Sequence, residues 1–209
     1  MCNLYRMTKN ADEVAQWFDA ANAARGVNLA AETYPGTPGL VVADGSVRPM
    51  NWGFPLVMTG KNGQKLKPRP VNNARTDKLG SYFWRDSYRD RRCLIPLTAW
   101  AEAEGDKGSK TRTWLSVPDA ELFACAGLWS DSDEFGVSYA MVMTGSDGSP
   151  AGQVHDRMPV LLAPDDYERW LSAPPDEAKT LCNAWTGPLN IDRTDEAWVK
   201  GRASQKPLF

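Results

Sequence analysis

The stretch RRCLIPLTAWAEAEGDKGSKTRTWLSVPDAELFACAGLW, residues 91–129, decides the fold of this chain. Its first part, residues 91–96, is a short apolar run that predicts a buried strand, which residues 99–104 continue. A Gly-Asp-Lys-Gly turn then follows at residues 105–108. Three further strands, rich in β-branched and aromatic residues, are expected at residues 111–117, 121–129 and 136–144. The stretch therefore predicts successive short antiparallel strands.

A helix is expected on the N-terminal side of this stretch. Asn10 is a suitable N-cap, and Glu13 completes a variant of the capping box. Apolar residues then recur at helical spacing until Gly26, which is expected to end the helix. This stripe comprises Val14, Trp17, Phe18 and Ala21.

Shorter elements complete the pattern. Residues 40–54 predict a hairpin that turns at Asp44-Gly45. The aromatic residues between positions 82 and 88 predict a short helix. A short strand is expected at residues 160–162, and Pro164 is expected at the first position of another helix.

These elements together predict an α+β fold. We expect a single compact domain over residues 1–199, made mostly of short antiparallel strands in a barrel-like sheet with helices around it. The C-terminal tail, residues 200–209, has little to bury and is expected to be mobile.

The composition is that of an ordinary globular protein, with 42% hydrophobic and 24% charged residues among 209. One sizeable core fits this length. No apolar run approaches the roughly 18 residues of a membrane span, and no secretory signal is apparent. We therefore expect a soluble, cytoplasmic protein, associated with the nucleoid if it is bacterial.

Charge and cysteine usage exclude several classes of protein. The formal net charge of −2 rules out binding of nucleic acid through overall charge, although a local basic groove remains open. The four cysteines form no CxxC pair and His155 is the only histidine, so no multi-histidine or zinc-type metal site is expected.

The N-terminal Met1-Cys2 pair can provide two reactive groups on one residue. Once Met1 is removed, Cys2 bears an α-amine with a pKa of about 7.7–8.0 beside a thiol with a pKa of about 8.5. An aldehyde can condense with the amine to an imine, and the thiol can then close a thiazolidine ring. The thiol can instead attack an acyl carbon, as in N-terminal nucleophile hydrolases. A third interpretation is that Cys2 is a small buried hydrophobic residue.

Residues 61–75 form a second unusual stretch, in which five cations lie among glycines and prolines without core periodicity. Most charge runs of this kind are solvated surface loops. The alternative is a loop that contacts phosphates.

Five short motifs then occur in a specific order along residues 1–170. They are Met1-Cys2, Asn73-Ala74-Arg75, Arg92-Cys93-Leu94-Ile95-Pro96 followed by Glu102, Gly127-Leu128-Trp129, and His155-Asp156-Arg157-Met158-Pro159. Each is short, but the ordered set resembles the SRAP family, the SOS response-associated peptidase or abasic-site processing proteins.

The resemblance implies a barrel-like α+β domain whose N-terminal cysteine covalently captures abasic sites in single-stranded DNA during the response to DNA damage. It implies that Cys2 is the crosslinking nucleophile, that Asn73 positions it, that Glu102 is the acid/base, and that His155 assists at the sugar. Met1 removal would account for the peptidase name, and a lyase activity stays open. The chemistry needs no cofactor, since proximity supplies most of the acceleration, and we expect a monomer.

The resemblance also implies contacts with DNA. Arg75 and Arg157 match family arginines near the DNA backbone. The basic stretch, the nine tryptophans and the rigid turn around position 35 supply further candidates, because cations contact phosphates and aromatic rings stack on unpaired bases. These additional DNA-binding candidates are Lys67, Arg69, Trp52 and Pro35.

The chain departs from the family pattern at several places. The third and fourth residues, often Gly and Arg, are Asn3 and Leu4 here, so a phosphate contact from position 4 is lost. The residue after the glutamate, commonly aromatic, is Ala103, and the usual Ala-Asp-Gly after the proline is replaced by residues 97–99.

Local patterns leave other roles open for the same residues. Glu102 can be an outward-facing strand residue, His155 a structural histidine, and Asn73 a turn residue. Asp156 is expected to be a poor partner for His155, because adjacent residues on an extended segment point to opposite sides.

Two other functions compete with abasic-site capture. One is an N-terminal nucleophile amidohydrolase that uses the Cys2 thiol on an acyl substrate. The other is a non-catalytic module for single-stranded DNA, in which the tryptophans and the cations of residues 61–75 bind the strand.

Overall fold

A five-stranded antiparallel sheet forms one part of the computed structural model, which describes residues 2–198. β1 lies inside this sheet, between β10 and β3, so the N-terminal segment is held on both sides. The strands, in spatial order, are β16 (Asn190–Ala197), β11 (Thr111–Ser116), β10 (Ala99–Glu104), β1 (Tyr5–Arg6) and β3 (Glu32–Thr33).

A larger mixed sheet packs beside it. Its main path runs β14 (Arg157–Pro159), β13 (Ser138–Gly145), β12 (Phe123–Ser130), β9 (Arg92–Leu97), β4 (Pro38–Ala43), β5 (Ser46–Trp52) and β2 (Ala21–Asn22). Two short strands attach to this path, namely β15 (Leu161–Leu162) on β12 and β8 (Asn73–Arg75) parallel to β13. The expected α+β class is confirmed, whereas the sheet is mixed and not wholly antiparallel.

Strands near the two ends of this sheet also pair with each other. β13 also pairs in parallel with β5, over Ser138↔Asn51 and Tyr139↔Trp52. The link between β4 and β9 consists of the single pair Val42↔Leu94. Because the ring of pairing depends on such short links, the barrel-like sheet stays a prediction.

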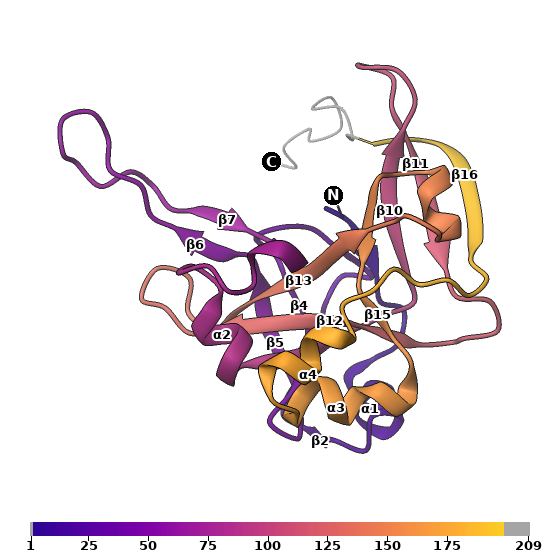
Figure 1. The fold of residues 1–209 in the computed structure, drawn as a ribbon, viewed down its shortest axis with the longest axis horizontal. Coiled ribbons are helices and arrows are strands. Elements are labelled where there is room, and N and C mark those ends of the chain that lie inside the picture. The colour runs from indigo at the N-terminus through magenta and orange to yellow at the C-terminus, as the bar shows by residue number, and fades with distance from the viewer. Residues whose placement is uncertain (1, 199–209) are drawn as a thin grey trace, which may run out of the picture.

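A two-stranded arm projects from the body in Figure 1. It consists of β6 (Phe54–Leu56) and β7 (Arg69–Val71), joined through a bridge between Thr59 and Lys65. The predicted loop at residues 61–75 thus includes the end of a hairpin and all of β8.

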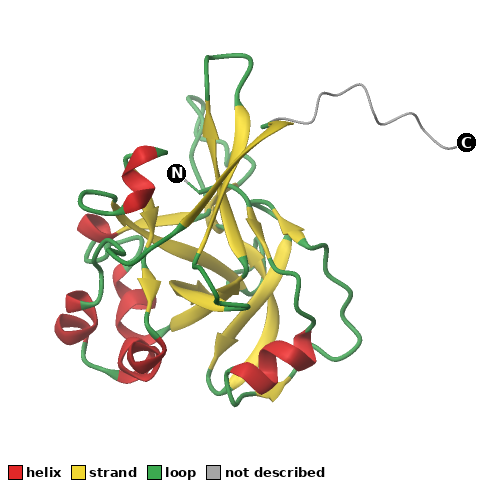
Figure 2. Ribbon diagram, turned by 90° about the vertical axis from the view of Figure 1, so that its right-hand side faces the viewer, coloured by secondary structure: helices red, strands yellow, loops and turns green. Residues whose placement is uncertain are grey.

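Short helices lie at the periphery of the strands (Figure 2). They are the α-helices α1 (Ala11–Trp17), α2 (Arg85–Asp90), α3 (Tyr167–Ser172) and α4 (Pro175–Thr180) and the 3₁₀ turns η1 (Thr76–Lys78), η2 (Pro150–Gln153) and η3 (Pro164–Asp166). Within residues 2–198, none of the helices is long and apolar enough to span a membrane. The predicted tail, residues 200–209, lies outside the described residues.

The first helix is shorter than its sequence pattern predicts. The capping box at Asn10 and Glu13 is present, as expected. The helix nevertheless ends at Trp17, because Asp19 adopts a left-handed conformation with φ of 47°. Ala21 therefore belongs to β2, and Trp17 is 50% exposed and does not face the core.

The predicted strand pair at residues 91–104 divides between the two sheets. The chain bends at Thr98, whose backbone N–H donates to the Arg6 carbonyl at 2.8 Å. β9 continues the large sheet with all six residues buried, while β10 crosses to pair with β1. This crossing brings Glu102 next to the N-terminal segment.

Arg92, in the predicted motif before Pro96, has a structural role. Its buried guanidinium donates to the carbonyls of Tyr88, at 2.7 Å, and of Trp170 and Ala173. Because the last turns of α2 and α3 leave their carbonyls unsatisfied, a cation there holds both helices on β9.

Candidate active site

Cys2 lies at the start of the segment that forms β1, and its side chain is fully buried. The pairing of β1 with β10 extends beyond Tyr5, since Ala101 N–H donates to the Leu4 carbonyl at 2.9 Å. Its thiol lies 3.5 Å from that same carbonyl. Strand pairing, which needs no contact with substrate, therefore fixes where Cys2 sits.

Asn73 reaches the Cys2 backbone from the other sheet. It is 9% exposed on β8, and its Nδ2 donates to the Cys2 carbonyl at 2.8 Å. Its Oδ1 is buried and has no hydrogen-bond partner among residues 2–198. The turn interpretation of Asn73 is wrong, because the residue begins a buried strand and leaves an acceptor free beside Cys2.

Glu102 is 2% exposed, so it is not an outward-facing strand residue. Burial raises the pKa of its carboxyl to about 7. Its charge in turn helps to raise the pKa of the Cys2 thiol, an effect second to burial of the thiol itself. Near neutral pH, Glu102 can both donate and accept a proton, whereas Cys2 is a thiol and not a thiolate.

His155 lies at the edge of this group. Its Nε2 is 4.0 Å from Glu102 Oε2, and the side chain is 28% exposed. Burial lowers the pKa of the imidazole, so it is neutral at pH 7. The Arg157 N–H lies 3.1 Å from Nδ1 and donates to it, which orients the ring with Nε2 toward Glu102.

Asp156 points toward His155, contrary to the prediction. Its Oδ1 is 2.8 Å from His155 Nδ1. The alternation rule fails because Asp156 lies in a bend that follows η2, not in an extended strand. The carboxylate is 80% exposed, so solvent screens the interaction and it stabilises the imidazolium weakly.

The predicted DNA contacts divide into exposed and buried residues. Lys67 and Arg69 are exposed on the arm, and Pro35 is half-buried. Arg75 is 44% exposed and forms a bidentate pair with Asp77. Arg157 lies on β14. β8 and β14 pair with neighbouring positions of β13, so these last two arginines lie on strands that flank the same strand.

Trp52 was expected to stack on DNA, and this prediction is wrong. The side chain is fully buried, edge-on to Tyr5 at 5.1 Å and stacked with Tyr139 at 6.3 Å. Its Nε1 donates to the Asn72 carbonyl at 3.0 Å. No surface is left on Trp52 for a base.

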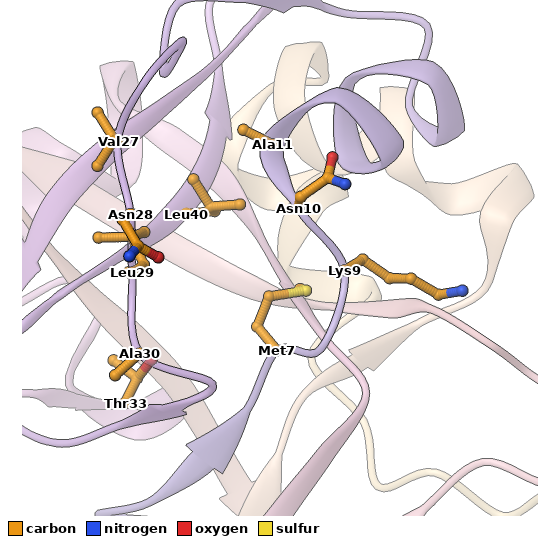
Figure 3. A pocket seen from close by; sticks show the side chains of 11 residues that line it. Met7, Lys9, Asn10, Ala11, Val27, Asn28, Leu29, Ala30, Thr33 and Leu40 are labelled. Atoms are coloured by element: carbon orange, nitrogen blue, oxygen red, sulfur yellow. The ribbon is translucent and has the colours of Figure 1, made fainter.

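A groove of about 800 Å³ adjoins the Cys2 segment and includes Pro35. It also includes Asn3, Leu4 and Asn72, all beside Cys2 in sequence or hydrogen-bonded to that segment. A smaller cavity of about 100 Å³ lies between the 27–33 segment and the start of α1 (Figure 3). None of the side chains that line it comes from the group around Cys2.

Sequence reasoning missed two features of this region. One is Asn72, whose amide also reaches the Cys2 carbonyl. The other is the buried Arg112, which lines the groove with Glu32 and pairs with Glu32 at 3.1 Å and with Glu196 at 3.2 Å. The two consecutive asparagines were a sequence signal for Asn72. The ion pairs of Arg112 join residues that are far apart in sequence, and no local pattern predicts them.

The sequence model of the SOS response associated peptidase (SRAP) family matches residues 1–197. The chain belongs to the SRAP family. Two relatives from Bacillus subtilis strain 168 are abasic site processing proteins, YoaM with 26% identity over 139 residues and YoqW with 27% over 140. Each match covers 63% of this SRAP chain and about three-fifths of the relative, 60% and 61% respectively.

Solved structures show the same fold as this SRAP chain. A Bordetella bronchiseptica protein superposes with a TM-score of 0.76 at 21% identity, covering 92% of this chain and 99% of the other. A Bacteroides thetaiotaomicron protein gives a TM-score of 0.74 at 18% identity, with 92% and 91% covered. At such identities the likeness concerns the fold alone.

Proposed function

We propose that this SRAP protein processes abasic sites by covalent capture. Cys2, freed by removal of Met1, condenses with the open-chain aldehyde of an abasic site in single-stranded DNA and forms a thiazolidine. Two relatives that carry the name abasic site processing protein support the general activity. The capture chemistry is inferred from the arrangement of the site.

One observation carries the proposal. Cys2, Asn73 and Glu102 come from three separate segments, yet meet in one buried group that contains a carboxyl with a pKa of about 7. A buried carboxyl lowers fold stability when it ionises, so a purely structural explanation of Glu102 is weak. Condensation of an amine with an aldehyde needs such a group, because protons must be given and taken near neutral pH.

Capture passes through a carbinolamine and an iminium ion to the thiazolidine. The neutral Cys2 amine adds to the aldehyde carbon, and a proton moves from nitrogen to oxygen to give a carbinolamine. Protonated Glu102 donates to the carbinolamine hydroxyl, water leaves, and a protonated imine (iminium ion) remains beside the Glu102 carboxylate. The thiol sulfur then adds to the iminium carbon, the C=N electron pair returns to nitrogen, and the thiol proton passes to the carboxylate, which restores protonated Glu102. The products are a thiazolidine and one water molecule.

Removal of Met1 is a requirement of this chemistry. While Met1 is attached, the Cys2 nitrogen is an amide and cannot form an imine. We assign the peptidase activity in the family name to this single cleavage, made by the chain itself or by an aminopeptidase. Reversal of the crosslink through Glu102 would be the corresponding lyase activity.

The surroundings of the site suit a single strand. Exposed Lys67 and Arg69, together with Arg75 and Arg157, are suited to phosphate contacts. Pro35 lies at the groove that adjoins Cys2, where a flexible strand can approach. A stacked duplex would keep the sugar out of reach, so we propose recognition of unpaired DNA by a monomer without cofactor.

The state of the thiol argues against an acyl-transfer hydrolase. Such an enzyme attacks with a thiolate, and burial holds the pKa of Cys2 well above its ordinary value. Capture starts with the amine and uses the thiol only in an intramolecular second step, where proximity compensates for weak acidity. The buried thiol therefore favours abasic-site capture over an amidohydrolase.

The test uses matched single-stranded oligonucleotides with and without one abasic site. Protein with a confirmed free Cys2 terminus is incubated with each, then resolved on a denaturing gel and by intact mass. A heat-stable adduct with only the abasic oligonucleotide, at a mass one water below the sum, is the expected result. Absence of any adduct would refute the proposal, whereas an adduct that persists in Cys2→Ala would transfer the role to another residue.

A further inference from the structure

The Asn72 side chain makes two hydrogen bonds to the N-terminal segment. Its Nδ2 donates to the Cys2 carbonyl at 3.1 Å and to Asn3 Oδ1 at 3.0 Å. An amide nitrogen has two hydrogens, so both donors are used on consecutive residues of the segment that precedes β1. Asn72 therefore holds the same segment that carries the reactive groups.

The Cys2 carbonyl thus receives two donors, Nδ2 of Asn72 at 3.1 Å and Nδ2 of Asn73 at 2.8 Å. A carbonyl oxygen has two lone pairs, and both are occupied. Two donors that converge on one oxygen fix the plane of the peptide group. Because this plane is joined to the Cys2 Cα by a single bond, fixing it limits the directions that the amine and the thiol can take.

Asn72 is itself held from the core. Its backbone carbonyl accepts from Trp52 Nε1 at 3.0 Å and from Met141 N at 2.9 Å. Trp52 is fully buried and clamped by aromatic rings, and Met141 lies on β13 of the large sheet. The amide of Asn72 is therefore held in place before substrate arrives, as an efficient positioning group must be.

We propose that Asn72 is a positioning residue for covalent capture: with Asn73 it clamps the Cys2 carbonyl, and it thereby aims the amine at the aldehyde and keeps the thiol within reach of the imine carbon. This inference rests on the proposed function and adds a residue to it. Asn72 touches neither the aldehyde nor the sugar in this role. Its contribution is to rate and not to DNA affinity.

The test compares Asn72→Ala and Asn72→Asp with the wild type, all with a confirmed free Cys2 terminus. Asn183→Ala is the matched control, because Asn183 is exposed and also donates one side-chain hydrogen bond to a backbone carbonyl. Thermal melting checks each fold. Crosslinking is measured against concentration of abasic single-stranded DNA, which separates apparent affinity from the maximal rate.

Asn72→Ala should lower the maximal crosslinking rate about tenfold, the scale of one well-placed hydrogen bond, with apparent affinity unchanged. The same loss should occur with glycolaldehyde, which reports thiazolidine formation by intact mass without any DNA. Asn72→Asp keeps the shape, loses the donors and adds a negative charge that favours the ammonium form of Cys2. The pH profile of its crosslinking rate should therefore shift to higher pH, which a purely structural loss would not cause.

The outcomes separate this inference from the proposed function. No adduct with the wild type refutes the proposed function itself. A wild-type adduct together with unchanged rates in Asn72→Ala overturns only the role of Asn72. A weaker DNA affinity with a normal glycolaldehyde rate also overturns it, because Asn72 would then be a DNA contact. If Asn72→Ala does not fold, Asn72→Asp decides by its pH profile.

Discussion

The group around Cys2 and the projecting arm place polar residues in opposite environments. Cys2, Asn73 and Glu102 are each 9% exposed or less, and each is fixed by strand pairing or by hydrogen bonds. The arm carries four exposed cations between residues 61 and 69, and that segment has no acidic residue. Covalent chemistry needs a dry, rigid group with a perturbed pKa, whereas phosphate binding needs charges that solvent and salt can reach.

The largest expected effect separates the two reactive groups of residue 2. Cys2→Ser keeps the amine but replaces the thiol by a poorer nucleophile. We expect complete loss of the heat-stable adduct and a remaining imine, which borohydride reduction of abasic DNA mixtures should trap. DNA affinity in binding assays should stay within about twofold, because the group is buried. A heat-stable adduct formed by Cys2→Ser without reduction would contradict ring closure by the thiol.

The next effect concerns proton transfer. Glu102→Gln keeps the shape and removes the acid/base, so the single-turnover crosslinking rate should fall by about 10²-fold or more. The wild-type rate should change with pH near 7, the pKa of Glu102, and this feature should vanish in the variant. An unchanged rate and pH profile would remove Glu102 from the mechanism.

The same variant should be more stable above neutral pH. The folded-state pKa of about 7 lies above the ordinary value of 4.5, so the protonated form stabilises the fold below pH 4.5 and this stability is lost as pH rises to 7. Glu102→Gln avoids the loss and should raise the free energy of unfolding by about 3 kcal/mol at pH 8. Urea unfolding at pH 4 and pH 8 measures the difference, and equal gains at both values would argue against a raised pKa.

The arm should affect binding and leave the chemistry intact. Replacing both Lys67 and Arg69 with alanine should weaken binding of single-stranded DNA about tenfold at low salt. It should also reduce the slope of the logarithm of the binding constant against the logarithm of salt concentration by between about one and two. The maximal crosslinking rate at saturating DNA should not change. Anisotropy titrations at several salt concentrations measure the first effect, and a lower maximal rate would show that the arm also orders the site.

The smallest effect tests the corrected role of Trp52. Trp52→Phe keeps an aromatic ring in the core and removes the hydrogen bond to Asn72. Stability should fall by about 1 kcal/mol from the lost bond, with an added loss where the smaller ring leaves space. DNA affinity should be unchanged, since no part of the indole is exposed. A specific loss of affinity without loss of stability would restore Trp52 as a stacking platform.

Much of the local structure follows from short-range sequence signals. The capping box at Asn10 and the Asp44-Gly45 hairpin are formed as expected, because their hydrogen bonds close within a few residues. The end of α1 was missed because tertiary pairing of β2 with β5 competes with helix propensity. The last strand, β16, was missed as well, since its residues are mostly polar and exposed and show no apolar pattern.

The sequence by itself determined the family and the strand-rich class, and it named the candidate reactive residues, because ordered motifs and local propensities are written along the chain. Only the tertiary structure decided which polar residues are shielded from solvent. Glu102 becomes a carboxyl with a raised pKa because β10 bends away from β9, and Asn72 reaches Cys2 because Trp52 anchors it. Desolvation and convergence depend on what packs around a residue, and neighbours distant in sequence supply that packing.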